Sequence, residues 1–332
     1  MQRLSQMSER RKRPVSRPFF SGLYGLHPIQ SEAVSNECHR QSPPGAARSD
    51  AWTALPMQNP TQAPLIPPRP WPRSPLLNVW VDNLNMQELM QEATAGVIFT
   101  LNPDHLFHLQ RNAEFLAAYR QADFITSDSK YVYWGLGWIG RRIQEKVSGS
   151  DIVPTFCHHH RENLATRVFL LGAAPGIAQK ALERINAREG RQIVVGAHSP
   201  SMNFVNDADE ISDVIRIVNS SGATALIVGL GAPKQEIWIV RYRDAMPGVK
   251  VFMGVGATID YEADAVVRAP RWMARNGLEW LYRLTTEPKR YWRRYFRDLE
   301  FFWLVLLDGV GLYRAPVLAA APAAAADAGS KR

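Results

Sequence analysis

Short apolar runs alternate with stretches of helical periodicity between residues 76 and 265. Apolar runs that predict β-strands lie at residues 79–81, 97–101, 124–126, 168–171, 193–195, 225–228 and 251–255. Helical patterns at 104–119, 175–188, 208–218 and 233–242 fit between these runs. Strands that alternate with helices predict an α/β fold with a doubly wound, mostly parallel sheet. The continuous apolar run at 225–228 is typical of a strand that is covered on both faces.

The two ends of the chain and a basic helical segment differ from this α/β core at 76–265. Thirteen of the 23 prolines precede residue 76, and Ser, Gln and Arg fill much of the space between them. Residues 1–75 are therefore predicted to form a disordered tail. Residues 266–312 are helical in pattern and basic, which predicts an appended helical region. The Ala/Pro-rich residues 313–332 are predicted to form a second disordered tail.

The formal net charge of +8 indicates an acidic partner, which is nucleic acid, anionic lipid or a phosphorylated substrate. A basic nucleic-acid-binding module is therefore one alternative function. Much of the positive charge lies in the N-terminal tail and the last helices, and the predicted core carries no recognised DNA or RNA motif, so we expect no nucleic-acid partner. No apolar run approaches the ~20 residues that span a bilayer.

Polar residues and glycines follow several predicted strands, at the edge where a doubly wound sheet binds its ligands. Glycine lets the backbone approach a ligand closely, and a helix that starts there offers free N–H groups to phosphate or sugar oxygens. Tight turns needed for packing are the alternative explanation of each glycine pair. Neither GxG continues as GxGxxG, which argues against a second alternative function, a nicotinamide-dependent oxidoreductase. The residues at these strand ends are Thr100, Asn102, Asp128, Gly229, Gly231, Gln235, Gly256 and Asp260.

Asp128 is the best candidate for a general base. It follows the apolar run at 124–126 and precedes an aromatic segment at 131–138, so its carboxylate is expected on the rim of the sheet, partly shielded by aromatic side chains. The alternative is a helix N-cap, a position in which Asp is favoured.

Two other groups of residues could suggest a metal ion. His158, His159 and His160 are consecutive, and adjacent helical residues do not share a face, so we expect no metal site there. Asp207 and Asp209 lie in a polar loop before a predicted helix, where an N-cap explains them better than metal binding.

Arginine and aromatic residues interleave between residues 280 and 297. Arg283, Arg290, Arg294 and Arg297 are seven, four and three residues apart, so they are predicted to share one helical face, with Arg293 beside it. An apolar run at 301–307 follows. Such a segment suits the surface of an anionic membrane, and arginine suits bidentate binding of phosphate. The alternative is a solvated, charged face.

In this order, the motifs resemble those of the WecG/TagA/CpsF family, glycosyltransferase family twenty-six, over residues 77–302. The resemblance implies an inverting, Rossmann-like enzyme of cell-envelope or exopolysaccharide biosynthesis. Such an enzyme would move a hexose or N-acetylhexosamine, such as N-acetylmannosamine, glucose or a uronic acid, from a UDP-sugar to a polyprenyl-diphosphate-linked saccharide. It would use no cofactor and no metal, and would be cytoplasmic and peripheral on the inner face of the cytoplasmic membrane. The matching segments are 228–236 with Trp238, 254–260, 268–272, 277–280, Tyr282 with Arg283, and Glu287 with Pro288.

The resemblance also implies roles for single residues. Asp128 falls at the position of the proposed catalytic base, although Ser127 and Ser129 flank it where the family often has Ala and Gly. Lys146 stands where an arginine is common, and it keeps the charge but loses the bidentate fork. The glycine turns would shape the nucleotide-sugar pocket, and Gln235 would contact sugar hydroxyls. The remaining active-site positions are Thr100, Asn102 and Asp260, and the arginines that complete the site and bind diphosphate are Arg283, Arg290 and Arg293.

Overall fold

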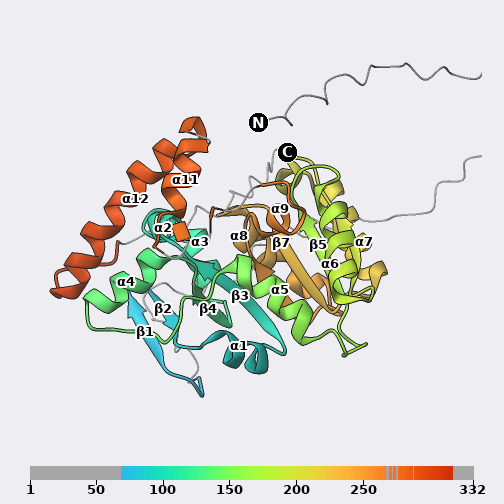
Figure 1. Ribbon diagram of the computed structural model, residues 1–332, viewed down its shortest axis with the longest axis horizontal. Coiled ribbons are helices and arrows are strands. Elements are labelled where there is room, and N and C mark those ends of the chain that lie inside the picture. The colour runs from blue at the N-terminus through green and yellow to red at the C-terminus, as the bar shows by residue number, and fades with distance from the viewer. Residues whose placement is uncertain (1–68, 267–268, 271, 274–275, 287, 317–332) are drawn as a thin grey trace, which may run out of the picture. The chain divides into compact units, whose positions relative to one another are not determined.

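The computed structural model describes residues 69–266, 269–270, 272–273, 276–286 and 288–316. A six-stranded sheet runs through this part of the chain in the order β4-β3-β8-β7-β5-β6, and all neighbouring strands are parallel (Figure 1). The predicted doubly wound α/β fold is therefore confirmed. The strands are β3 (Gly96–Leu101), β4 (Phe124–Ser127), β5 (Val168–Gly172), β6 (Val194–His198), β7 (Ala225–Gly229) and β8 (Val251–Gly254).

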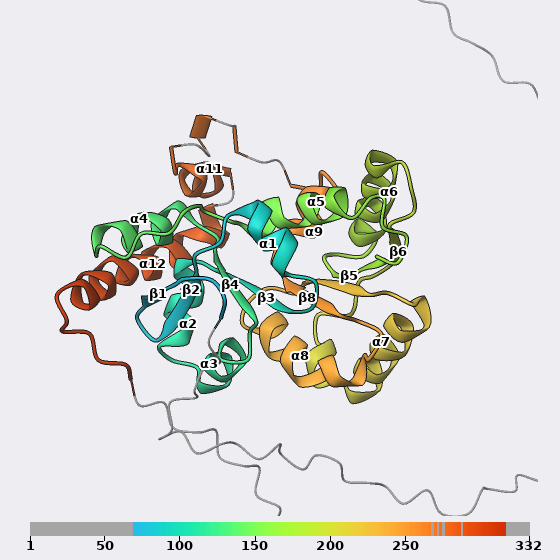
Figure 2. The ribbon, with the colours of Figure 1, turned by 90° about the horizontal axis from the view of Figure 1, so that it is seen from below.

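Helices cover both faces of the sheet, and the strand side chains alternate between two buried clusters (Figure 2). Phe99 belongs to one cluster and its neighbour Ile98 to the other, as the two-residue period of a strand requires. Burial on both faces explains why the strands are continuous apolar runs. One face carries α1 (Met86–Glu92), α5 (Gly149–His159), α6 (Ile177–Glu189) and α9 (Thr258–Glu262). The other carries α2 (Pro103–Leu109), α3 (Ala113–Tyr119), α7 (Ala208–Ser221) and α8 (Lys234–Tyr242).

The parallel arrangement brings the carboxyl ends of all six strands to one edge of the sheet. The chain moves outwards from β3 to β4 on one side and from β5 to β6 on the other. The connecting helices of these two units, α2–α3 and α6, cover opposite faces. Such a reversal of winding opens a crevice at the carboxyl edge, which is where ligands of doubly wound folds bind.

Two predicted elements differ in detail from the structure. The single helix expected at 104–119 is two helices, α2 and α3, because Asn112 accepts a hydrogen bond from the Phe115 backbone N–H at 3.0 Å and so begins a new helix. The run at 79–81 lies in β2 (Val79–Asp82), which pairs with β1 (Arg73–Leu76) in a separate antiparallel hairpin. This hairpin begins at Arg73, within the segment expected to form the N-terminal tail, and the two predicted tails otherwise lie largely outside the described residues.

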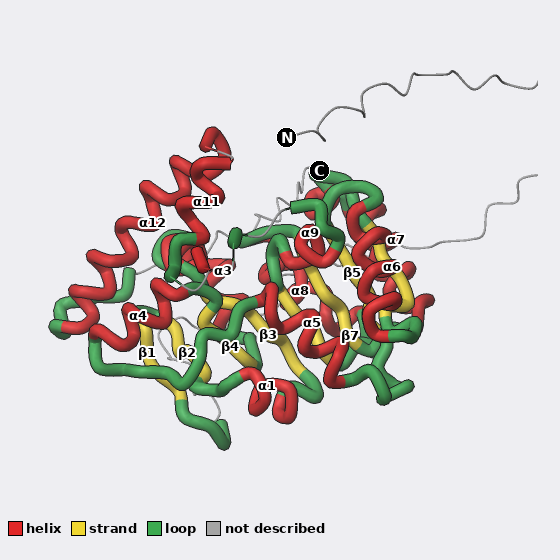
Figure 3. Tube along the Cα trace, viewed as in Figure 1, coloured by secondary structure: helices red, strands yellow, loops and turns green. Residues whose placement is uncertain are grey.

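The basic C-terminal segment forms two helices, α11 (Glu279–Thr286) and α12 (Pro288–Gly309) (Figure 3). The predicted common face of the four arginines is therefore wrong, because Arg283 lies in α11 and the other three lie in α12. Pro288 at the start of α12 explains the break, since proline has no N–H to continue a helix but suits a first turn. In the described part of the chain, no helix is both long enough and apolar enough to cross a membrane.

One face of α12 belongs to the core. Phe301 and Val305 are each 2% exposed, and they lie against Gly135 in α4 (Lys130–Trp138). The expectation that the whole run at 301–307 prefers lipid is therefore wrong, although Trp303 and Leu306 on the other face of α12 are exposed.

Ion pairs attach the middle and the C-terminal end of α12 to the core. Arg297 donates to Asp104 in α2 at 3.2 Å, and Arg141 donates to Asp308 at 2.6 Å. Arg297 was expected on the phosphate-binding and membrane-binding face, but the structure places its guanidinium against the first turn of α2.

We predict that Phe301→Ala lowers the free energy of unfolding by about 3 kcal/mol or more, because it leaves a cavity between α12 and α4. Trp303→Ala, on the exposed face of the same helix, should change it by no more than about 0.5 kcal/mol. Urea denaturation followed by circular dichroism measures both. A change for Phe301→Ala as small as the one expected for Trp303→Ala would show that this face of α12 is not part of the folded core.

Candidate active site

Asp128 lies at the carboxyl edge of the sheet, directly after β4, and its backbone N–H donates to the carbonyl of Leu101 at 2.8 Å. The cap of the following helix is Ser129, whose hydroxyl accepts a hydrogen bond from the Val132 N–H at 3.1 Å. The alternative reading of Asp128 as that N-cap is therefore wrong. Asp128 Oδ1 accepts instead from the Gly149 backbone N–H at 3.1 Å, at the start of α5. The positive end of α5 thus orients the carboxylate and stabilises its negative charge.

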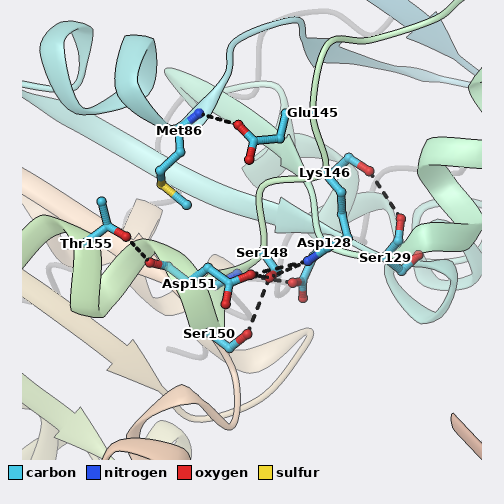
Figure 4. A network of polar contacts seen from close by, with 11 residues as sticks. Met86, Asp128, Ser129, Glu145, Lys146, Ser148, Ser150, Asp151 and Thr155 are labelled. Carbon is cyan, nitrogen blue, oxygen red and sulfur yellow. Dashed lines mark hydrogen bonds and ion pairs between the residues drawn. The ribbon is translucent and has the colours of Figure 1, made fainter. Parts of the chain in front are cut away.

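A small polar network surrounds Asp128 (Figure 4). Lys146 Nζ donates to Ser148 Oγ at 2.8 Å and lies 3.4 Å from Asp151 Oδ2. Ser148 Oγ donates to the same carboxylate oxygen at 2.5 Å. The sequence-based assignment included Lys146 but missed Ser148 and Asp151. The missed signal is a Ser followed three residues later by an acidic residue, a pattern typical of a helix N-terminus, which in this fold lies at the carboxyl edge of the sheet.

Thr100 is the second-last residue of β3, and Asn102 directly follows this strand at the same edge. Thr100 is buried, and its hydroxyl donates to the Gly254 carbonyl at 3.4 Å, which joins the ends of β3 and β8. Asn102 is the N-cap of α2, and its side-chain oxygen accepts from the His105 N–H at 3.0 Å.

Gln235 joins the two glycine turns that follow β7 and β8. Its side chain is 1% exposed, and its Oε1 accepts from the Gly231 N–H at 3.2 Å and from the Gly256 N–H at 3.1 Å. Gly231 and Gly256 have positive φ, and no atom lies within 4 Å of the position that a Cβ would occupy, so both turns border open space. Packing explains Gly229 instead, since a Cβ there would lie 2.8 Å from the Gly256 carbonyl oxygen.

The other residues of the predicted site lie in the C-terminal part of the chain. Asp260 is half-buried in the first turn of α9, after the turn that contains Gly256. Arg293 is exposed, with its guanidinium 5.4 Å from the centre of the Trp292 ring. The side chains of Arg283 and Arg290 lie outside the described residues. Arg283 lies in α11 and Arg290 in α12; α11 packs against α12, and α12 packs against α2.

Glu236 is a buried carboxyl group that the sequence analysis did not single out. Burial raises its pKa to about 7, the hydrogen bond from Gln235 Nε2 at 2.7 Å opposes this, and the negative charge of Asp104 adds to it. His105 Nδ1 lies 3.9 Å from Glu236 Oε1 and 2.5 Å from the Tyr119 hydroxyl. The sequence did contain a signal for this burial, because Glu236 lies three residues before Ile239 and therefore on the apolar face of α8.

The residues considered for a metal have other contacts. His158 Nδ1 lies 3.2 Å from Glu189 Oε2. Asp207 is the N-cap of α7, as predicted, and its Oδ1 accepts from the backbone N–H groups of Asp209 at 3.1 Å and Glu210 at 3.0 Å. Among the residues that the structure describes, no group of three or more His, Cys, Asp or Glu side chains is placed to hold a metal ion.

Comparison with known proteins identifies the family. The profile of the Glycosyl transferase WecG/TagA/CpsF family matches residues 74–315. The chain belongs to this family. It is therefore a glycosyltransferase, and the predicted resemblance is confirmed. The matched residues extend from β1 through α12, so the C-terminal helices belong to the family's common structure.

Two relatives carry the same name, N-acetylglucosaminyldiphosphoundecaprenol N-acetyl-beta-D-mannosaminyltransferase. The protein from Bacillus spizizenii is 33% identical over 230 residues, which are 69% of this chain and 86% of the relative. The protein from Bacillus subtilis is 29% identical over 232 residues, which are 70% of this chain and 87% of the relative. Neither alternative function, a nucleic-acid-binding module or an oxidoreductase, agrees with membership of this glycosyltransferase family.

We predict that Glu236→Gln removes a pH dependence of stability. Below about pH 4.5 the carboxyl is protonated in both folded and unfolded protein. As pH rises to about 7, the unfolded carboxyl ionises while the buried one keeps its proton, so the free energy of unfolding should fall by about 3 kcal/mol. Denaturation of both proteins at several pH values isolates this contribution, because Asp104, His105 and Tyr119 around it are unchanged. A constant difference between the two proteins from pH 4.5 to 8 would contradict it.

Proposed function

We propose that this glycosyltransferase moves a hexose or N-acetylhexosamine from a UDP-sugar to a polyprenyl-diphosphate-linked saccharide, with inversion at the anomeric carbon. The names of the two relatives support this, since they specify an N-acetylglucosaminyl-diphosphoundecaprenol acceptor and transfer of a β-linked N-acetylmannosaminyl group. A β-linked product requires inversion if the sugar is α-linked to the nucleotide. The observation that carries the proposal is the Asp128 carboxylate, held by the Gly149 N–H at the carboxyl edge of the sheet.

In the proposed reaction, Asp128 acts as the general base. It takes the proton from an acceptor hydroxyl, whose oxygen attacks the anomeric carbon on the face opposite the nucleotide. The bond from the anomeric carbon to the diphosphate oxygen breaks as the new glycosidic bond forms. UDP leaves with the bonding electron pair, and the proton on Asp128 is later lost to water. A single displacement of this kind needs one base and no covalent intermediate on the protein.

Cationic side chains would stabilise the charge that develops on the leaving diphosphate. Lys146 is suited to this because its ammonium group has three donors, and the contacts to Ser148 and Asp151 do not use them all. Arg283, Arg290 and Arg293 would approach from α11 and α12. Gln235 is better suited to holding the two glycine turns than to touching the sugar, since its amide is buried and its oxygen bonds both turns.

We also propose that the protein lies on the inner surface of the cytoplasmic membrane through an apolar stripe on α12. The residues of this stripe are separated by four, three, four, three and four positions, so they lie on one side of the helix, and each is between 53% and 71% exposed. An amphipathic helix with aromatic residues and neighbouring arginines is suited to the interface of an anionic bilayer. The apolar stripe consists of Trp292, Phe296, Leu299, Trp303 and Leu306 in α12 and of Val310, which directly follows the helix.

We predict that Asp128→Asn lowers the transfer rate by about 10²–10⁴-fold, because an amide cannot accept the proton. The amide oxygen can still accept from the Gly149 N–H, so folding and UDP-sugar binding should change little. Asp207→Asn is the matched control, since asparagine caps a helix equally well. The measurement is transfer from a radiolabelled UDP-sugar to a synthetic lipid-diphosphate acceptor. Normal turnover by a folded Asp128→Asn protein would remove Asp128 from the mechanism.

A second prediction concerns the apolar stripe. The double variant Phe296→Ser/Trp303→Ser should bind anionic liposomes more weakly but transfer sugar normally to a short-chain, water-soluble acceptor, because both side chains are exposed and outside the core. Leu164→Ser changes an exposed leucine elsewhere and serves as the control. Co-sedimentation with liposomes measures the difference. Unchanged binding of the double variant would show that the apolar stripe does not contact lipid.

A further inference from the structure

We infer that Glu236 is a positioning residue that fixes the orientation of the Gln235 side-chain amide and, through it, the two glycine turns at the carboxyl edge. The inference rests on the proposed function only for the experiment that measures KM for the UDP-sugar donor. Glu236 itself is 0% exposed and accepts a hydrogen bond from the Gln235 side chain. It would therefore act through Gln235 rather than on a substrate.

The contacts form one continuous path. Glu236 Oε1 accepts from Gln235 Nε2 at 2.7 Å, and Gln235 Oε1 accepts from the backbone N–H groups of Gly231 and Gly256. The two glycines follow β7 and β8, which are neighbouring strands. A single amide therefore holds two turns, and a single carboxyl oxygen receives the other end of that amide.

Some contact has to determine which way round the Gln235 side-chain amide lies. The oxygen and the NH₂ group of a glutamine are similar in size, so shape alone does not select one orientation. With the amide reversed, its NH₂ group would face two backbone N–H donors, and both would lose their acceptor. An acceptor beside Nε2 disfavours the reversed orientation. An ionised carboxylate can only accept, and a protonated carboxyl group keeps one carbonyl oxygen that accepts.

Burial of a carboxyl group at this position is costly, which argues against a role in packing alone. Glu236 Oε2 is buried and has no hydrogen-bond partner among the described residues, and His105 Nδ1 is 3.9 Å from the other oxygen. An unsatisfied buried oxygen destabilises a fold, and an apolar side chain would fill the same space without that cost. The position of Glu236 also connects α8 to His105 in α2, the helix that Asn102 begins. The carboxyl group thus lies between Gln235, which holds the β7 and β8 turns, and the helix that follows β3.

The test is a double-mutant cycle with Glu236→Met, Gln235→Met and the double variant, together with the conservative Glu236→Gln. Methionine keeps the approximate volume but removes the acceptor. Hydrogen exchange of the Gly231 and Gly256 amides is followed by NMR, with core amides of β7 as internal reference. We expect about tenfold faster exchange of both glycine amides in either single Met variant, and no further increase in the double variant. Glu236→Gln should resemble the unmodified protein, because its side-chain oxygen can still accept from Gln235.

Steady-state kinetics supply a second readout. Glu236→Met should raise KM for the UDP-sugar about tenfold while kcat changes less, since both glycine turns border open space and the Gly149 contact that holds Asp128 does not involve Glu236. Faster exchange throughout β7 as well, or unchanged exchange at both glycines, would show that Glu236 is a core residue only. Additive effects in the cycle would show that it does not act through Gln235.

If no UDP-sugar is used at all, the proposed function fails while the exchange measurement still decides this inference. If Glu236→Met does not fold, Gln235→Met and Glu236→Gln still test the path through the two glycine amides.

Discussion

Backbone N–H groups at the carboxyl edge of the parallel sheet have to find acceptors without closing the space that a ligand needs. Side chains meet this constraint at two places. Gln235 Oε1 accepts from the turns after β7 and β8, and Asp128 accepts from the first N–H of α5. The same contact that satisfies α5 therefore also orients the proposed base. This double use explains why a carboxylate stands at the end of β4 although Ser129 already caps the next helix.

The two-sided character of α12 connects the fold with the proposed place of the reaction. Phe301 and Val305 lie in the core, whereas Trp303 and Leu306, on the opposite side, are exposed. Arg297 binds Asp104 in the first turn of α2, close to the Asn102 cap. The helix that would contact lipid is thus packed on a helix of the site. Removing it would expose apolar core as well as removing arginines, so loss of activity in a truncated protein would not by itself identify a role for those arginines.

Local patterns in the sequence were sufficient to predict the strands of the main sheet and several residues of the candidate site. Apolar runs marked each strand of the main sheet. A position at or after the end of a strand marked Asp128, Thr100 and Gln235, because the carboxyl ends of parallel strands meet at one edge. What remained hidden depends on contacts between distant segments. Helical periodicity continues across Asn112, so the break between α2 and α3 was not visible. The partner of Arg297 is an aspartate far away in the sequence, and the burial of Glu236 follows from how α2, α3 and α8 pack. The family resemblance, rather than residue patterns, supplied the reaction class.

The anomeric configuration of the transferred sugar tests the central claim most directly. With a UDP-sugar labelled with carbon-13 at the anomeric carbon, the one-bond carbon–proton coupling of the product reports whether the new glycosidic bond is α or β. A single displacement with Asp128 as base predicts a configuration opposite to that of the donor. Retention of the donor's configuration would require a second displacement and a nucleophile that the proposed mechanism does not contain, and it would contradict the account.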